Sequence, residues 1–289
     1  MTDEQKPFVW QMNTDGPETY ERYIVPTWML DWTDDLIAAA GVGPEKRVLD
    51  VACGTGIVAR RAAGLVGPAG RVAGLDANEG MLRVAEKCAG EEGATNIRWY
   101  HCDACCMPFS PGEFDAVLCH QGLQFFPDRN AALREMARVL VPGGRIALGV
   151  WGRAEKSPHV GVICDVIGRY FGDEATSLFK KACSLSDRTE LKNLVRDAGF
   201  SGIRIKAGIK IARHPSLAEL LPAYFSIFPV AKEIAAMQEK DRERMFQDLV
   251  TALAAYREND GLAVPTENYI VTAKKTVSPT IGINEGEPL

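Results

Sequence analysis

The sequence predicts an α/β fold, in which seven mostly parallel strands form one open, doubly wound sheet with a helical cap. Three observations support it. Short apolar runs alternate with helical patterns through the first half of the chain. A glycine turn follows the first run, and Pro142-Gly143-Gly144 separates a helical pattern from the fifth run. Such alternation implies parallel strands joined by right-handed crossovers.

The predicted strands are short apolar segments bounded by glycine, proline or polar residues. They cover residues 47–51, 71–76, 97–102, 114–119, 144–150, 202–207 or slightly beyond, and 269–273. The predicted helices lie between and after them, at 18–40, 57–65, 81–88, 130–139, 158–171, 174–183, 187–198 and 215–257.

The chain divides into four parts. Residues 1–40 are expected to form an N-terminal helical cap, and 41–211 plus 266–275 the Rossmann-like core. Residues 212–265 form a helical insertion that is longer than a connection in a compact domain usually is, so we expect a lid over the ligand end of the sheet. Residues 276–289 are expected to form a flexible tail.

The segment Val48–Gly56 predicts a site for a cofactor that carries a nucleoside. It is a buried-strand pattern that ends in the tight turn allowed by Gly54 and Gly56. The turn also fits the loose dinucleotide fingerprint of nicotinamide enzymes. Asp50 favours a different ligand, because a carboxylate there opposes a pyrophosphate and suits a cationic ammonium group.

Asp76 ends the second predicted strand, 20 residues after Gly56. Ribose hydroxyls need an acceptor at this place in both cofactor classes. The residue therefore predicts a ribose site and does not distinguish the two classes.

Composition excludes several classes of function. The net charge of −5 and the pI of about 5.5 give no reason to bind nucleic acid. No run approaches the roughly 20 apolar residues of a membrane span. The acidic start at residues 1–4 lacks the features of a secretion signal, so we expect a cytoplasmic protein with reduced thiols.

Three of the eight cysteines cluster at Cys102, Cys105 and Cys106. Clustered thiolates can hold a soft metal or an arsenical. However, no second ligand pair follows at zinc-type spacing, and small buried cysteines usually pack as apolar residues. We therefore expect no metal site.

A series of five motifs resembles the class I S-adenosylmethionine-dependent methyltransferases, in particular the small-molecule branch similar to ubiquinone and menaquinone biosynthesis methylases. The motifs appear in order at Val48–Gly56, Gly74–Met81, Cys102–Phe109, Phe114–Cys119 and Arg138–Gly144. The resemblance covers roughly residues 18–150 and implies a Rossmann-like, doubly wound core with S-adenosyl-L-methionine as cofactor.

The resemblance assigns the methionine and ribose ends of the cofactor. It implies that Asp50, Ala52, Gly54 and Gly56 surround the methionine part. Asp76 would accept both ribose hydroxyls. The alternative for Asp76 is that it merely caps a helix or a turn.

The resemblance also assigns the adenine end. Ala77 and Met81 would pack against the adenine ring, and Asp103 would accept from its amino group beside the backbone of Ala104. Asp103 has the same capping alternative as Asp76. Tyr20 would close over the cofactor, or simply pack against the sheet.

The resemblance places Cys119, His120 and Gln124 beside the sulfonium and the substrate. The sulfonium already activates the methyl group, so the protein mainly aligns the two reactants. His120 is the candidate general base, with a hydrogen-bonding spacer as its alternative, and Gln124 is a candidate for orienting the substrate.

The predicted reaction is methyl transfer from S-adenosylmethionine to a small, partly apolar acceptor. The aromatic residues Tyr224, Phe225 and Phe228 of the insertion suggest the apolar character, although such a stripe is more often core. The alternatives are a nicotinamide-dependent oxidoreductase, a cofactor-binding regulatory protein without turnover, and an arsenite methyltransferase. The expected partners are the acceptor and, as a possibility, a second copy in a homodimer.

Overall fold

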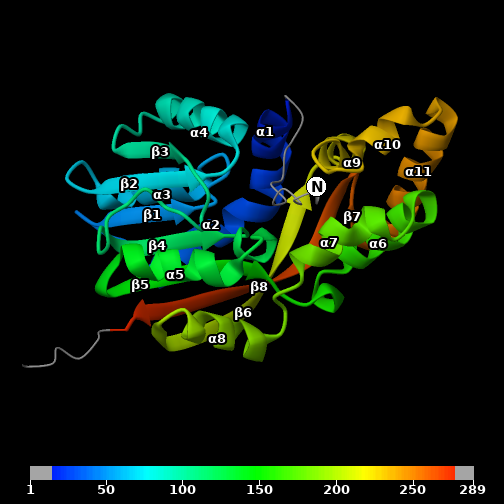
Figure 1. Ribbon diagram of the computed structural model, residues 1–289. Coiled ribbons are helices and arrows are strands. Elements are labelled where there is room, and N and C mark those ends of the chain that lie inside the picture. The colour runs from blue at the N-terminus through cyan, green and yellow to red at the C-terminus, as the bar shows by residue number, and fades with distance from the viewer. Residues whose placement is uncertain (1–14, 277–289) are drawn as a thin grey trace, which may run out of the picture.

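The computed structural model describes residues 15–276 and has one mixed sheet with helices on both faces (Figure 1). Its strands are ordered β3-β2-β1-β4-β5-β8-β6, and the short β7 pairs with β8. The first five strands of this order are parallel, and β8 pairs antiparallel with β5 and β6. The predicted α/β class is confirmed.

All seven predicted strands are present, and the two-residue β7, inside the predicted insertion, adds a short eighth strand. The bounds are β1 Arg47–Val51, β2 Arg71–Asp76, β3 Ile97–His101, β4 Phe114–His120, β5 Leu140–Trp151, β6 Phe200–His214, β7 Arg257–Glu258 and β8 Gly261–Lys275.

Two strands are far longer than predicted. β6 and β8 pair from Phe200 opposite Lys275 to His214 opposite Leu262. They leave the core and continue into the region of the insertion, as Figure 1 shows. Residues 212–214 and 261–265, placed in the helical insertion by the sequence pattern, are therefore strand. Antiparallel pairing explains the extension, because each strand satisfies the other's backbone groups beyond the sheet's edge.

β5 is also longer than predicted. It begins at Leu140, so Pro142-Gly143-Gly144 lies inside the strand, where the pairing with β4 shifts register. Gly143 has a φ of +73°. The motif therefore forms an irregularity within β5 and not the predicted separating turn.

The N-terminal helical region runs without interruption from α1 (Gly16–Thr19) through η1 (Tyr20–Met29) to α2 (Leu30–Ala40). η1 has π-helical winding, which the sequence pattern did not predict, and the Leu30 N–H donates to the Val25 carbonyl. Pro26 lies inside it and has no N–H to donate, which explains the wider winding.

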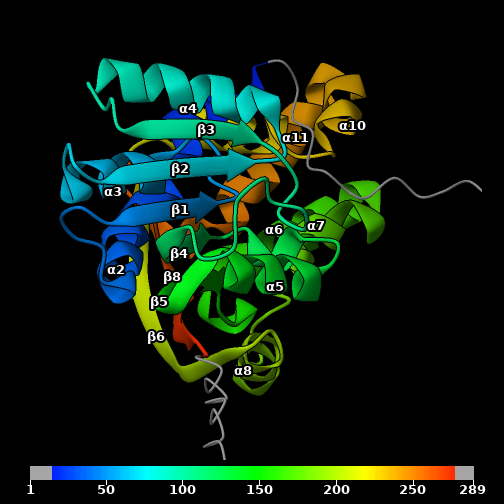
Figure 2. The ribbon, with the colours of Figure 1, turned by 60° about the vertical axis from the view of Figure 1, so that its left-hand side comes forward.

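Helices cover both faces of the sheet. The core on one face combines the strands with α5 (Arg129–Val139) and α8 (Arg188–Asp197). The core on the other face includes α2 and α3 (Ile57–Val66). The remaining helices of the first half are α4 (Glu79–Glu91), beside β3 (Figure 2), and the short η2 (Leu123–Phe125) after β4.

A second helical group lies at one side of the sheet (Figure 1). It has its own apolar core, which includes η1 and the far ends of β6 and β8. The elements are η3 Ala154–Lys156, α6 Pro158–Phe171, η4 Glu174–Thr176, α7 Ser177–Ala182, α9 Leu217–Ser226, α10 Ala231–Ala236, α11 Glu239–Ala252 and η5 Ala254–Tyr256. We call this group the lid. The predicted tail lies, apart from Thr276, outside the described residues.

The carboxyl ends of the parallel strands meet at one edge of the sheet, where the chain order reverses between β1 and β4. Ligands of open α/β sheets bind at this point. Ala52 after β1 and Gln121 after β4 have φ values of +55° and +58°. Strained residues of this kind cluster at functional sites, so this edge is the candidate site.

Candidate active site

A cavity lies at the carboxyl edge of the sheet, and we call it the cofactor cavity. Nine of the residues predicted from the sequence line it, together with eight others. The lining residues are Tyr20, Ala52, Gly54, Leu75, Asp76, Ala77, Asn78, Met81, Cys102, Asp103, Ala104, His120, Gln121, Gly122, Phe125, Phe126 and Pro127.

The predicted residues Asp50, Gly56, Cys119 and Gln124 do not line this cavity. Asp50 is 1% exposed, and its Oδ2 accepts from the Ala59 N–H of α3 at 3.0 Å. Its Oδ1 is buried without a partner, and burial raises its pKa. Asp50 therefore joins the end of β1 to the first turn of α3 and does not border the cavity.

The two glycines of the turn have different environments. Gly54 has a φ of +54°, and a Cβ there would approach the Tyr20 ring at 3.9 Å, within the cavity. Gly56 has a φ of +82°, and a Cβ there would lie 2.5 Å from the Trp99 indole. Gly54 keeps the cavity open, whereas Gly56 allows α3 to begin against β3.

Asp76 connects the first two strand ends. Its Oδ2 accepts from the Gly54 N–H at 2.8 Å, and its Oδ1 accepts from the Asn78 N–H at 2.9 Å. Burial raises its pKa. Each carboxylate oxygen keeps a second lone pair, so the capping role and a ligand-binding role are compatible.

The residues predicted for the adenine end of the cofactor are two alanines, a methionine and one carboxylate. Met81 and Ala104 are buried and line the cavity together with Ala77. Asp103 is exposed, and its Oδ1 accepts from the Cys105 N–H at 2.7 Å. Asn78 caps α4 by accepting from Gly80 and Met81 N–H groups.

His120 lines the cavity from the end of β4, with its ring packed against Gly149 of β5. Its Nε2 is buried without a partner, and burial lowers its pKa to about 4. The ring is therefore neutral at pH 7, and a group whose conjugate acid has this pKa is a weak base.

Gln124 reaches the cavity only through Gln121. Its Nε2 donates to Gln121 Oε1 at 2.7 Å, and Gln121 Nε2 donates to Asn268 Oδ1 of β8. Cys119 is fully buried in the core beneath them. Gln121 is one of the eight lining residues that the sequence analysis missed, because only the fold brings Asn268 of β8 to the end of β4.

The cysteine cluster shows no metal-binding arrangement. Cys102 Sγ donates to the Cys106 carbonyl at 2.9 Å, and Cys105 Sγ donates to the Asp128 carbonyl at 3.5 Å. Burial raises the pKa of Cys105 to about 11, which keeps this thiol protonated. In residues 15–276 no group of three or more His, Cys, Asp or Glu could hold a metal ion.

A second, largely apolar cavity adjoins the first, and we call it the lid cavity. It shares Tyr20, Gln121 and Phe125 with the cofactor cavity. Its other side chains come from η1, α6, α7 and α9, from the end of β5 and from the two residues after α9. These include Ile24, Trp28, Met29, Trp151, His159, Ile163, Leu178, Phe179, Tyr224, Ile227 and Phe228.

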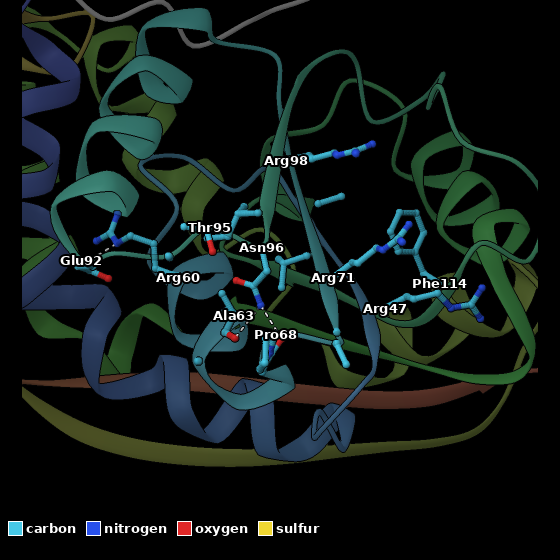
Figure 3. Close-up of a pocket in the computed structure, with 18 of the residues that line it drawn as sticks. Arg47, Arg60, Ala63, Pro68, Arg71, Glu92, Thr95, Asn96, Arg98 and Phe114 are labelled. Atoms are coloured by element: carbon cyan, nitrogen blue, oxygen red, sulfur yellow. Dashed lines mark hydrogen bonds and ion pairs between the residues drawn. The ribbon is translucent and has the colours of Figure 1, made fainter.

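An open hollow at the opposite edge of the sheet is lined by arginines (Figure 3). Arg47 and Arg71 begin adjacent strands, and Arg98 lies on β3. Arg47 is paired with Asp115 at 2.8 Å. This edge holds the amino ends of the strands and none of the predicted site residues, so it is not the candidate site.

Comparison with known proteins identifies the family. A sequence model of the ubiE/COQ5 methyltransferase family matches residues 28–215. This chain belongs to the ubiE/COQ5 methyltransferase family. A demethylmenaquinone methyltransferase of Geobacillus is 33% identical over 62% of this chain and 80% of the relative. A ubiquinone/menaquinone biosynthesis C-methyltransferase of Ectopseudomonas mendocina is 34% identical over 60% and 72%, respectively.

Solved structures show the same fold. The YcgJ protein of Bacillus subtilis superposes with a TM-score of 0.59 at 19% identity, over 86% of this chain and all of the other. A phosphoethanolamine N-methyltransferase 2 of Haemonchus contortus in complex with S-adenosyl-L-methionine has a TM-score of 0.58 at 19% identity, over 92% of this chain and 58% of the other. The predicted Rossmann-like fold is thus confirmed.

The family membership confirms the predicted enzyme class, a methyltransferase, and its cofactor, S-adenosyl-L-methionine. The cofactor cavity fits this group. The buried Asp50 Oδ1 lacks a partner beneath the turn, and Gly54 leaves room that a Cβ would fill. The nicotinamide, regulatory and arsenite alternatives find no support in the family match.

Proposed function

We propose that this methyltransferase acts on an apolar aromatic acceptor of the quinol type, bound in the lid cavity. The observation that carries the proposal is the junction of the two cavities, which share Tyr20, Gln121 and Phe125. An acceptor among the lid aromatics would therefore meet the cofactor at this junction. Aromatic side chains favour a flat apolar ring through offset and edge-to-face contacts.

The residues of the cofactor cavity would hold S-adenosylmethionine as the sequence predicts. Asp76 would accept from the ribose hydroxyls, Asp103 and the Ala104 backbone would bind the adenine amino group, and Met81 would pack on its ring. The loop at Ala52 and Gly54 would hold the methionine part above Asp50. When bound, the cofactor supplies a methyl group made electrophilic by its sulfonium.

The chain's own contribution to the reaction is alignment. Gln121 lines both cavities and is held by Asn268 on one side and Gln124 on the other, so its side chain would keep one orientation at the junction. Tyr20 covers both cavities from η1. Holding two reactants in line can contribute several kcal/mol, on the order of 7 to 11 in favourable models.

The relatives support a quinone-type acceptor, since their names give demethylmenaquinone and ubiquinone or menaquinone biosynthesis as their substrates or pathways. Part of the lid cavity lies outside the matched residues 28–215, namely Tyr20, Ile24, Tyr224, Ile227 and Phe228. These side chains of the lid cavity would therefore select the particular ring.

The proposed acceptor class is tested with reduced short-chain demethylmenaquinone and S-adenosylmethionine. We expect a product that is one methyl group heavier, detected by mass spectrometry. Tyr224→Ala should raise the KM for this acceptor about tenfold or more and leave the Kd for S-adenosylmethionine within twofold. Turnover of a polar amine acceptor in preference to the quinol would contradict the proposal.

The cofactor assignment of Asp76 has a separate test. Asp76→Ala should weaken S-adenosylmethionine binding at least tenfold by calorimetry, because the ribose hydroxyls lose their charged acceptor. Asp241→Ala, which removes an exposed carboxylate of α11, is the control and should bind like the parent. Equal affinity of the parent and Asp76→Ala would remove Asp76 from the cofactor site.

The proposal includes a cytoplasmic location and no nucleic-acid partner. The free state of all eight cysteines supports a reducing compartment. The net charge of −5 opposes binding to a polyanion. No helix in residues 15–276 is long and apolar enough to cross a membrane. A homodimer remains a prediction, which sedimentation would test.

A further inference from the structure

The lid cavity contains two buried polar atoms that have no hydrogen-bond partner. They are Nε1 of Trp28 and Nδ1 of His159. Both residues line the cavity, and they are only 6% and 5% exposed. Buried polar groups in proteins are nearly always hydrogen-bonded, so two such exceptions in one apolar cavity require an explanation.

The two rings form a stacked pair built from different elements. Trp28 comes from η1 and His159 from the first turn of α6, and their ring centroids lie 4.6 Å apart at an interplanar angle of 21°. Trp151 packs edge-on against both, at 6.4 Å from Trp28 and 6.3 Å from His159. This packing restrains both rings, so neither can easily rotate toward a distant partner.

The amide side chain in the cavity wall does not satisfy them. Gln121 also lines the lid cavity, but its amide is already bonded to Gln124 and Asn268. Most of the remaining wall is aliphatic or aromatic. A ligand in the cavity is therefore the natural source of the missing partner.

The chemistry of the two nitrogens defines the ligand group. Burial lowers the pKa of His159 to about 3, so its ring is neutral at pH 7. With its proton on Nε2, the neutral ring accepts at Nδ1, whereas an indole N–H can only donate. A hydroxyl satisfies both, since it donates to one and accepts from the other. An ether oxygen or a carbonyl satisfies Trp28 alone.

We propose that Trp28 and His159 together recognise a hydroxyl group on the ring of the methyl acceptor. His159 Nδ1 accepts the hydroxyl proton, and Trp28 Nε1–H donates to the hydroxyl oxygen. The pair makes the lid cavity selective for hydroxylated rings over bare ones. This inference rests on the proposed function, which places an aromatic acceptor in the lid cavity.

Binding of three simple rings tests the proposal without turnover. The protein is saturated with S-adenosylhomocysteine, and the Kd values for 2-naphthol, 2-methoxynaphthalene and naphthalene are measured by calorimetry. The parent should bind 2-naphthol about tenfold tighter than naphthalene, with the methoxy compound much closer to naphthalene. Water favours the naphthol over naphthalene, so this preference requires hydrogen bonds inside the cavity.

Variants of the two residues show which side chains cause the preference for 2-naphthol over naphthalene. His159→Phe keeps the stacked ring and removes the acceptor, so the preference for 2-naphthol should fall below twofold. His159→Asn places a polar atom near Nδ1 and should restore part of it. Trp28→Phe should also reduce it. Tyr224→Phe, which removes a hydroxyl from the same cavity, is the matched control and should keep it.

The outcomes separate the two proposals. If all three rings bind the parent equally well, or if Tyr224→Phe loses the preference while His159→Phe keeps it, the role of the pair is overturned and the aromatic acceptor stands. If none of the three rings binds, the aromatic acceptor itself fails and the pair fails with it. Unchanged S-adenosylhomocysteine affinity in each variant shows that the variant is folded.

Discussion

At the scale of single residues, the site contains ionisable side chains held away from water. His120 and His159 are buried, and burial lowers their pKa values to about 4 and about 3. His120 was predicted as a general base, and its environment makes it better suited to shape the cavity wall than to remove a proton at neutral pH. The fold thus fixes the protonation state of both imidazoles.

These two histidines give a prediction for stability against pH. In the unfolded chain a histidine has a pKa near 6.5, so between about pH 6.5 and pH 4 the unfolded state binds more protons than the folded state. The contribution of the two histidines to the free energy of unfolding is therefore at its maximum above about pH 6.5. It falls as the pH is lowered to 4. The expected loss is on the order of 3 kcal/mol for each histidine.

Urea denaturation at several pH values measures this dependence. His159→Phe should lose clearly less stability than the parent between pH 6.5 and pH 4, because one of the two buried imidazoles is gone. His101→Gln, which replaces an exposed ring, should follow the parent. Parallel curves for the parent and His159→Phe would contradict the assignment.

At the scale of elements, the glycine turn depends on a packing contact that is remote in sequence. Trp99 of β3 lies opposite Gly74 of β2 and extends to Gly56 at the start of α3. A Cβ at Gly74 would clash with the Trp99 ring, and Cys53 Sγ would be 3.2 Å away. One indole thus sets the spacing of β2, β3 and α3 beneath the cofactor cavity.

Two alanine substitutions test this packing. Gly74→Ala should destabilise the protein by about 1 to 3 kcal/mol, because the added methyl overpacks the strand against Trp99. Gly64→Ala, in the exposed interior of α3 with nothing within 4 Å, should stabilise it by about 0.5 to 1 kcal/mol. If Gly74→Ala and Gly64→Ala changed the free energy of unfolding equally in urea denaturation, the Trp99 ring would have moved to accommodate the added methyl group.

At the scale of the whole molecule, the cofactor cavity and the lid cavity are formed by two different regions of the fold. The cofactor cavity is built mainly by the sheet edge and closed by Tyr20, whereas the lid cavity lies between η1 and the lid helices. The long strands β6 and β8 join these regions, since their far ends pack in the core of the lid. A ligand at the junction of the two cavities would therefore contact both the sheet region and the lid region.

Cofactor binding should stabilise the whole fold by mass action. S-adenosylmethionine at 100 times its Kd should add about 2.7 kcal/mol and raise the Tm by several degrees. Reduced nicotinamide dinucleotide at the same concentration should leave the Tm unchanged, because the family to which the chain belongs uses S-adenosyl-L-methionine as its cofactor. A shift with the dinucleotide and none with S-adenosylmethionine would contradict the cofactor assignment.

The sequence by itself determined the cofactor half of this protein. The strand and glycine turn at Val48–Gly56, together with Asp76 and Asp103, are local features at the ends of successive parallel strands, and parallel strands bring their ends to one edge wherever they pair. Nine of the predicted site residues accordingly line one cavity.

Only the tertiary structure decided the acceptor half. Trp28, His159 and Tyr224 lie on three helices far apart in the sequence, and Gln121 is fixed by Asn268 nearly 150 residues later. No local pattern distinguishes such aromatic residues from ordinary core, because an apolar face looks the same whether it packs against a helix or borders a cavity. The length of β6 and β8 could likewise not be predicted from the sequence pattern, since it arises from the pairing of the two strands with each other. The acceptor site is a product of packing, and packing is set by contacts that a linear sequence does not display.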